Sequence, residues 1–335
     1  MKTLSFSIEN LCVPCNCYCK HCLLDSKFCA TGVSYDRAEA FARRFYKWLG
    51  KVHPEIGGMF YVGYCMDFPE LSRWIAFVRE RDPNFSFLQF NGLKIRNGED
   101  LDLWMDEIKN NEIRMIDLTF FGLAEYHDRF AGRKGDFDYL IQILHGALER
   151  NIQVHGSICM NKANIDQLDS LLDLLKAEGV TQYTFFLPHD KGRGRNLCNL
   201  RLTQDDFNSL SEDIRSHFVK TKHLTESQWL SRKTLPMPAG RNLTLSLTPE
   251  NIERLEMMHP ETILHELEEM DDRFYDNIPA LSDLANEYGN SANQQIFRWR
   301  DLVLRWQMQY QQDHPMNCHD MNDERFSFSI RTYQE

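Results

Sequence analysis

Apolar and polar residues alternate along the first 200 residues in a way that predicts strands separated by helices. Short runs rich in β-branched and aromatic residues predict strands at 3–8, 59–62, 86–91, 114–119, 152–159 and 181–187. Apolar residues at helical spacing predict helices between them, the first running from a Ser34 cap to Gly50 and the second opening at Pro69. Three more helices are expected around 101–108, 140–148 and 164–175. This alternation predicts an α/β fold with parallel strands and right-handed crossovers, either an open sheet or a partial barrel.

The pattern changes after residue 200, where helical spacing dominates. One strand is predicted at 242–247, a closing strand at 325–331, and a loop or lid at 221–241. A stripe typical of a helix core recurs at Trp299, Leu302, Val303, Trp306 and Tyr310. We therefore expect a core domain at 1–200 and a mainly helical C-terminal extension at 201–335 that covers the barrel or binds substrate.

The overall charge bears on the partners of this chain. Its 335 residues include 38 Lys and Arg against 49 Asp and Glu, a formal net charge of −11. Binding nucleic acid needs clustered basic residues that displace counterions, and the densest basic stretch is the short run 191–195. This balance argues against nucleic acid as a partner. Because the chain has neither the ~20 apolar residues of a membrane span nor a signal-peptide pattern, we expect a cytoplasmic protein with no membrane partner.

Five of the ten cysteines lie between positions 12 and 22. Such crowding in a chain of this size favours a metal site over a disulfide framework. Cys15, Cys19 and Cys22 form the only C-x3-C-x2-C pattern in this run, and they follow the first predicted strand directly. Three thiolates can hold three irons of a four-iron cluster and leave the fourth iron open to a ligand. The alternatives are a zinc site or merely reactive thiols.

This spacing after a first strand, with Asn16 behind the first cysteine, resembles the radical SAM superfamily. The resemblance covers about residues 1–197 and implies a partial (β/α)6 TIM-type barrel of parallel strands. It implies a [4Fe-4S] cluster whose open iron binds S-adenosyl-L-methionine, which is reductively cleaved to a 5′-deoxyadenosyl radical that abstracts hydrogen. It also implies an electron donor such as flavodoxin or ferredoxin. The substrate of such a radical SAM enzyme is expected to be a peptide, a protein or a small molecule.

Later segments are similar to the places where that family binds S-adenosylmethionine. The corresponding residues are Gly63 after the second strand, Asn91 in the turn after the third, Thr119 after the fourth, Arg129 or Arg133 beyond it, Ser157 on the fifth strand and Leu187 at the end of the sixth. The resemblance implies that Thr119 and one of the two arginines hold the ligand's carboxylate. Each residue is also explained as an ordinary turn, strand or surface residue.

The family's glycine-rich segment after the second strand is degraded here. The stretch reads Val62-Gly63-Tyr64-Cys65, so a single glycine is left. Tyr64 and Cys65 are therefore the nearest candidates for quenching a substrate radical. His189, after the sixth strand, is a candidate proton donor, although isolated histidines usually are not.

The run Lys191–Arg195 follows the sixth strand and alternates basic residues with glycine. It is expected either to meet substrate or phosphate or to be a solvated turn. The remaining cysteines lack cluster spacing, so a single cluster is expected, and Cys12, Cys17 and Cys29 are expected to be small residues of a tight loop. Two other functions stay open: an RNA-modifying radical SAM enzyme, and an iron–sulfur or zinc protein without turnover.

Overall fold

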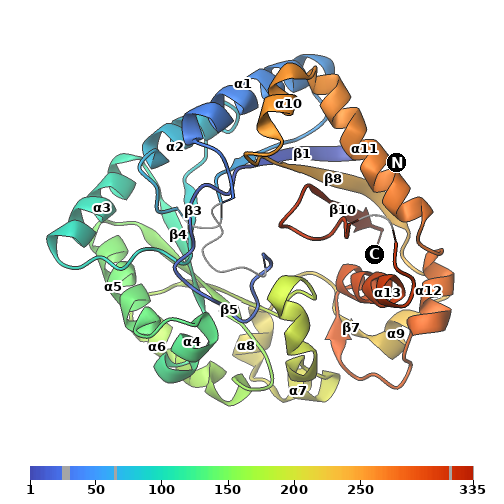
Figure 1. Cartoon of the computed structure of the whole chain (residues 1–335). Helices are drawn as coiled ribbons and strands as arrows, with labels where there is room; N and C mark the ends of the chain where they lie inside the picture. Colours follow the sequence, from blue (N-terminus) through green and yellow to red (C-terminus); the bar gives the residue numbers. More distant parts are fainter. Residues whose placement is uncertain (25–30, 64–65, 317–318, 335) are drawn as a thin grey trace.

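The computed structural model describes residues 1–24, 31–63, 66–316 and 319–334. All six strands predicted in the first part of the chain are present. They are β1 (Thr3–Glu9), β2 (Phe60–Tyr61), β3 (Phe87–Phe90), β4 (Met115–Phe120), β5 (Gln153–Cys159) and β6 (Gln182–Phe186). The helices that alternate with them are α1 (Tyr35–Val52), α2 (Leu71–Arg79), α3 (Glu99–Asn110), α4 (Ala124–Ala131), α5 (Asp136–Glu149) and α6 (Leu168–Ala177). Figure 1 shows these helices on the outside of an arc of strands.

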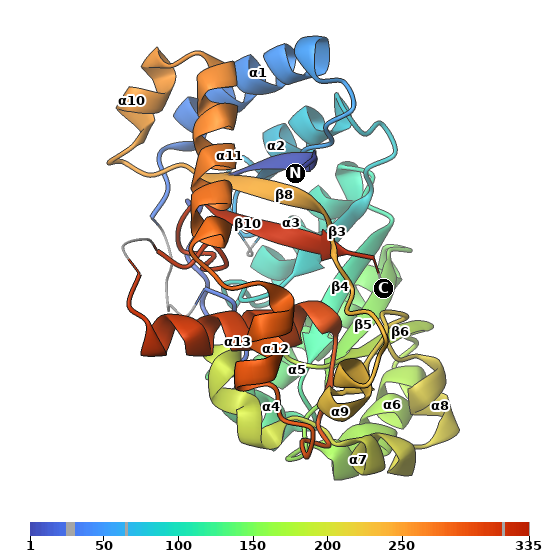
Figure 2. The same ribbon diagram turned by 90° about the vertical axis from the view of Figure 1, so that its right-hand side faces the viewer.

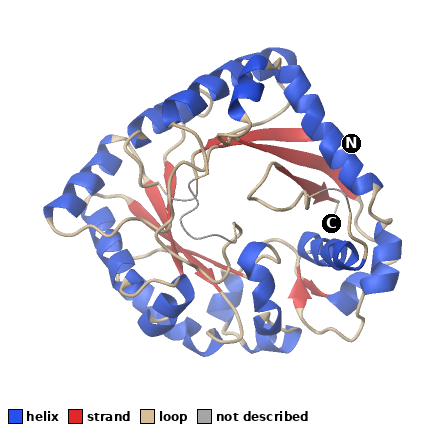
Figure 3. Ribbon diagram, viewed as in Figure 1, coloured by secondary structure: helices blue, strands red, loops and turns tan. Residues whose placement is uncertain are grey.

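Eight of the strands in the described ranges form two four-stranded sheets, ordered β10-β8-β1-β2 and β3-β4-β5-β6. Neighbours within the second sheet are all parallel, as are β1 with β2 and β1 with β8 (Pro238–Ser246). β10 (Phe328–Tyr333) adds an antiparallel edge to β8. No ladder joins β2 to β3 within the described ranges, so the arc is a partial barrel (Figure 3). The predicted α/β class with a partial barrel of parallel strands is confirmed.

Each strand turns one face to the helices and the other to the interior of the arc. On β1, Phe6 and Ile8 are fully buried, and the Phe6 ring stacks on Phe45 of α1 with ring centroids 4.3 Å apart. On β4, alternate apolar residues belong to the same core, whereas Asp117 and Thr119 lie between them. Because successive side chains of a strand point to opposite faces, these polar residues face the interior. The interior face is therefore the one that can carry chemistry.

The C-terminal part is mainly helical, as predicted. It contains α7 (Gln204–Ser209), α8 (Glu212–Ser216), β7 (Leu224–Thr225), α9 (Glu226–Leu230), α10 (Ile252–Met257), α11 (Pro260–Asp276), α12 (Leu281–Tyr288), β9 (Ile296–Phe297) and α13 (Trp299–Asp313). The stripe on α13 is buried in a second apolar core with Trp229 and Phe274. Figure 2 shows α11 and α13 near β8 and β10, whereas α7 and α8 lie at the lower end of the view near α6. No helix in the described ranges is long and apolar enough to cross a membrane.

One prediction about local structure is wrong, and one helix was not predicted. Residues 221–241 do not form a loop throughout, because β7, α9 and the start of β8 lie within them. The Thr225 and Gln228 side chains bond each other's backbone N–H groups in a capping box, which stabilises α9. The helix α4 was not expected. It buries few side chains and ends at Gly132, whose φ of +68° is a left-handed conformation that suits glycine.

Candidate functional site

The cysteine-bearing segment after β1 has no regular secondary structure between residues 10 and 24 and takes its shape from its neighbours. The Asn16 backbone N–H and side-chain amide both donate to the Gly92 carbonyl, at 2.9 and 3.1 Å. The Tyr18 N–H donates to the Ala131 carbonyl at 2.7 Å. Gly92 follows β3, and Ala131 ends the helix after β4. The segment, which we call the cysteine loop (10–24), therefore crosses the carboxyl ends of the parallel strands, where sites of such folds lie.

Gly92 fixes the place of the first cysteine. Its φ of +59° lies in the left-handed region, and a Cβ at this position would lie 2.1 Å from the Cys15 sulfur. The turn predicted from Asn91-Gly92 thus supports the cysteine loop directly, through backbone that only glycine allows this close. Asn91 itself is half-buried beside this contact.

The thiols of the cysteine loop differ in their surroundings. Cys15, Cys19 and Cys22 are half-buried, whereas Cys17 is 4% exposed and its sulfur lies 3.6 Å from an Asp136 carboxylate oxygen. The side-chain hydrogen bond with Cys17, together with burial, raises the pKa of Cys15 well above its usual value. Burial raises the pKa of Cys12 to about 11. Thiols in this state carry their protons, so metal binding would release them.

The three predicted ligands suit an iron–sulfur cluster by donor type and by access. They lie on one anchored loop and each is half-buried, while the intervening Cys17 is directed to a carboxylate. Within the described ranges, no three Cys, His, Asp or Glu side chains are gathered closely enough to hold a metal ion. Ligation therefore requires the three thiols to turn toward a common point.

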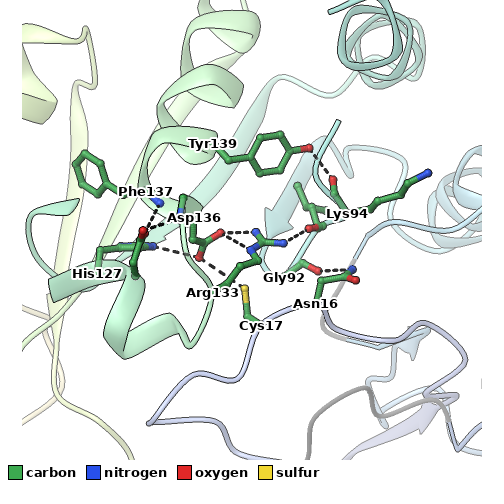
Figure 4. Close-up of polar contacts among 12 residues, drawn as sticks. Asn16, Cys17, Gly92, Lys94, His127, Arg133, Asp136, Phe137 and Tyr139 are labelled. Atoms are coloured by element: carbon green, nitrogen blue, oxygen red, sulfur yellow. Dashed lines mark hydrogen bonds and ion pairs between the residues drawn. The ribbon is translucent and has the colours of Figure 1, made fainter. Parts of the chain in front are cut away.

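Asp136, at the start of α5, organises a buried polar cluster behind the cysteine loop (Figure 4). Its carboxylate accepts from Arg133 Nε at 3.0 Å, and His127 Nε2 lies 3.2 Å away. Burial alone would raise the pKa of Asp136, but the contacts with His127 and Arg133 hold it below its usual value. The Arg133 guanidinium also donates to the Leu93 carbonyl. The cluster thus ties the cysteine loop to both the β3 turn and α5.

The residues predicted for S-adenosylmethionine fall in different settings. Thr119 is 7% exposed on the interior face of β4. Arg133 is bound as described above, whereas the Arg129 side chain is 66% exposed and lies 3.8 Å from Glu125. Gly63 has a φ of +123° and approaches the carbonyl of Val13 in the cysteine loop.

The other predicted site residues lie further around the arc. Leu187, just after β6, is 4% exposed. His189 is hydrogen-bonded to Arg298 and lies 3.8 Å from Asp301, and burial lowers its pKa. His189 thus has its partners at the start of α13 and does not stand alone at the carboxyl end of the sheet. Tyr64 and Cys65 lie outside the described residues.

Sequence reasoning missed a polar ladder on the interior face. Ser157 of β5 donates to Asp117 of β4 at 2.7 Å, and the same carboxylate lies 2.6 Å from His155 Nδ1. The other ring nitrogen of His155 lies 3.0 Å from the Thr184 hydroxyl of β6. The alternation of Asp117 and Thr119 with apolar residues along β4 was the signal that could have found it.

The C-terminal segment before β10 reaches the same side of the arc. Lys191, after β6, donates to Glu324 at 2.6 Å, and both side chains are buried. Glu9 ends β1 nearby and is 3% exposed. Burial first, and then the charge of Glu324, raise the pKa of Glu9 to about 8.

Comparisons with known proteins give one curated relative and several remote structures. No family model matches the chain. Fe-coproporphyrin III synthase of Methanosarcina barkeri is 28% identical over 141 residues, which are 42% of this chain and 33% of the relative. The match therefore spans about a third of that relative's length.

Among solved structures, Streptococcus suis SuiB bound to its precursor peptide SuiA is 11% identical, with 56% of this chain and 40% of that chain covered and a TM-score of 0.42. Coproporphyrinogen III oxidase (HemN) from Escherichia coli, described as a radical SAM enzyme, is 14% identical, with 56% and 44% covered and a TM-score of 0.36.

Proposed function

Since this chain is similar to the radical SAM superfamily, we propose that it binds a [4Fe-4S] cluster through Cys15, Cys19 and Cys22 and uses it on S-adenosyl-L-methionine. The observation that carries this proposal is the placement of three partly exposed thiols on one loop across the carboxyl ends of parallel strands. When bound, such a cluster supplies the electron that cleaves S-adenosylmethionine to a 5′-deoxyadenosyl radical.

Several residues around the cysteine loop have distinct roles in this proposal. Gly92 lies against the Cys15 sulfur, and the Cys17 thiol contacts the Asp136 carboxylate. We propose that Thr119 and one of Arg129 and Arg133 bind the carboxylate of S-adenosylmethionine. Thr119 faces the interior of the arc, and Arg133 lies beside the cysteine loop through Asp136. Ser157 is proposed for the ribose, and its bond to Asp117 orients its hydroxyl.

The substrate is proposed to be a peptide, a protein or a small molecule that enters the interior of the arc. The polar ladder of Asp117, His155 and Thr184 lines this interior and favours a substrate that carries a polar group. Polar side chains in a binding site orient a ligand by hydrogen bonds. An electron donor such as flavodoxin or ferredoxin would reduce the cluster. The net charge of −11 supports these substrates over RNA.

Cysteine variants test the cluster. Wild-type protein reconstituted without oxygen should bind about four irons and four sulfides per chain. Cys15→Ala, Cys19→Ala and Cys22→Ala should each lose the cluster, while Cys12→Ala and Cys17→Ala, the matched controls on the same loop, should keep it. A cluster that survives Cys15→Ala but not Cys12→Ala or Cys17→Ala would disprove the ligand assignment.

Formation of 5′-deoxyadenosine under dithionite tests the enzyme. Wild-type protein should release it from S-adenosylmethionine, and the three ligand variants should not. A fully loaded protein that releases none under any reductant would instead be a non-catalytic iron–sulfur protein.

A further inference from the structure

The run Lys191–Arg195 packs directly against the cysteine loop. Gly192 has a φ of +50°, and a Cβ there would lie 2.3 Å from the Cys22 carbonyl oxygen. A Cβ on Gly194 would lie 2.2 Å from the His189 carbonyl oxygen and 3.6 Å from that of His21. Both glycines are therefore required for a close approach between backbones. The run is not the solvated turn that its composition allows.

Arg193, between the two glycines, holds the cysteine loop twice. Its backbone N–H donates to the Cys22 carbonyl at 2.8 Å, and its Nε donates to the Cys19 carbonyl at 2.9 Å. Its guanidinium carbon lies 3.8 Å from the centre of the Tyr18 ring. The Arg193 side chain thus contacts Tyr18 and the backbone of the second predicted ligand, Cys19, and its backbone N–H binds the third, Cys22.

Among the described residues, Nη1 and Nη2 of Arg193 have no hydrogen-bond partner, and the guanidinium lies over the Tyr18 ring. The residue is 6% exposed. Leaving a charged group buried and unpaired is costly, and proteins avoid it unless an opposite charge lies nearby. By contrast, Arg195 is 38% exposed and pairs with Asp320 at 2.9 Å. The buried positive charge of Arg193 thus lies against the loop that carries the three thiols.

We propose that Arg193 is a positioning residue that compensates the negative charge of the cluster and raises its reduction potential. This inference rests on the proposed function, since it needs a cluster on Cys15, Cys19 and Cys22. A [4Fe-4S]2+ core with three thiolates carries a net charge of −1, and addition of one electron from the donor makes it −2. A fixed positive charge stabilises the second state more than the first.

Two substitutions of Arg193 separate its charge from its hydrogen bonds. Arg193→Gln removes the charge, Arg193→Lys keeps it without the guanidinium geometry, and Arg195→Gln is the matched control two residues away. The midpoint potential is measured by EPR during anaerobic titration with dithionite and mediators. We expect the ratio of reduced to oxidised cluster at a fixed potential to fall about tenfold in Arg193→Gln, which is about 59 mV for a one-electron couple. Arg193→Lys and Arg195→Gln should stay near the wild type.

The outcomes distinguish the inference from the proposed function. If the wild type binds no iron, the proposed function fails before Arg193 is tested. If the wild type holds its cluster and Arg193→Gln leaves the potential unchanged, the inference is wrong. Equal shifts in Arg193→Gln and Arg193→Lys would assign the effect to geometry and also overturn it. If Arg193→Gln fails to hold a cluster, a cluster of wild-type potential in Arg193→Lys supports the charge role, and loss in both variants contradicts it.

Discussion

Replacing Gly92 by alanine perturbs the contact between the turn after β3 and the cysteine loop. A residue with a side chain at a φ of +59° costs about 1–2 kcal/mol in the folded state. The new Cβ would also lie 2.1 Å from the Cys15 sulfur, well inside the ordinary contact distance of about 3.5–4.0 Å. Overpacking of this kind costs a further ~1–3 kcal/mol. The free energy of unfolding should therefore fall by about 2–5 kcal/mol.

Gly135→Ala is the matched control for the conformational cost of placing a side chain at a positive φ. Gly135 has a φ of +75°, and a Cβ there would meet no atom within 4 Å. This variant should therefore lose only the conformational cost of about 1–2 kcal/mol. The difference between the two variants isolates the contact with Cys15.

Two measurements decide the outcome: urea unfolding of the metal-free protein, followed by circular dichroism, and iron per chain after anaerobic reconstitution. Gly92→Ala should be less stable than Gly135→Ala by about 1–3 kcal/mol and should bind less iron. Rotation of the Cys15 thiol can reduce the loss of stability, but it moves the ligand, so iron binding should fall in either case. Equal iron content in the two variants would show that Gly92 does not position Cys15.

Two further predictions concern buried charges. Asp271 is fully buried and pairs with Arg241 at 3.0 Å, so Asp271→Asn should lower the free energy of unfolding by about 3–5 kcal/mol, against ~0–1 kcal/mol for half-exposed Asp272→Asn. Equal urea midpoints for the two variants would contradict this. Because the pKa of Glu9 is raised from 4.5 to about 8, the folded protein keeps a proton that the unfolded chain loses, and stability should decline as the pH rises between these values. Glu9→Gln should remove this decline, at most about 1.4 kcal/mol per pH unit, and equal slopes of Tm against pH for both proteins would refute it.

The strands of the arc were predictable because burial on one face leaves a local signature. Along β1, Leu4, Phe6 and Ile8 alternate with polar residues, and Phe6 and Ile8 belong to the same core as α1, so the alternation appears in the sequence itself. The pairing of β8 with β1 was not predictable, because it joins Ile8 to Leu245 across most of the chain. Local pattern identifies a strand but not its neighbour. The helix α4 escaped notice because only His127, Phe130 and Ala131 are buried along it.

The candidate site was predictable as far as its chemistry is encoded by spacing. Three cysteines at fixed intervals after a strand are visible without a structure, and so is a turn at Asn91-Gly92. The partner of a charged side chain is not visible in this way. Arg133 bonds to Asp136 only three residues on, yet the same sequence would allow it to point to solvent. Arg193 meets the cysteine loop from 174 positions away along the chain, a contact that only the assembled arc can bring about.

The loop that carries the three proposed ligands is anchored to the sheet beneath it. In the sheet ordered β3-β4-β5-β6, the two outer strands each send a turn to the cysteine loop: Gly92 after β3 contacts Cys15, and Arg193 after β6 binds the carbonyl of Cys19. The loop has no regular structure of its own, and these two contacts hold it across the sheet together with the hydrogen bond from Tyr18 to the Ala131 carbonyl. Evenly spaced backbone hydrogen bonds join the neighbouring strands of this sheet and fix the distance between the turns at its two edges. The loop therefore needs no internal order to hold its cysteines in place, provided that the turns at both edges keep the glycines that let them approach.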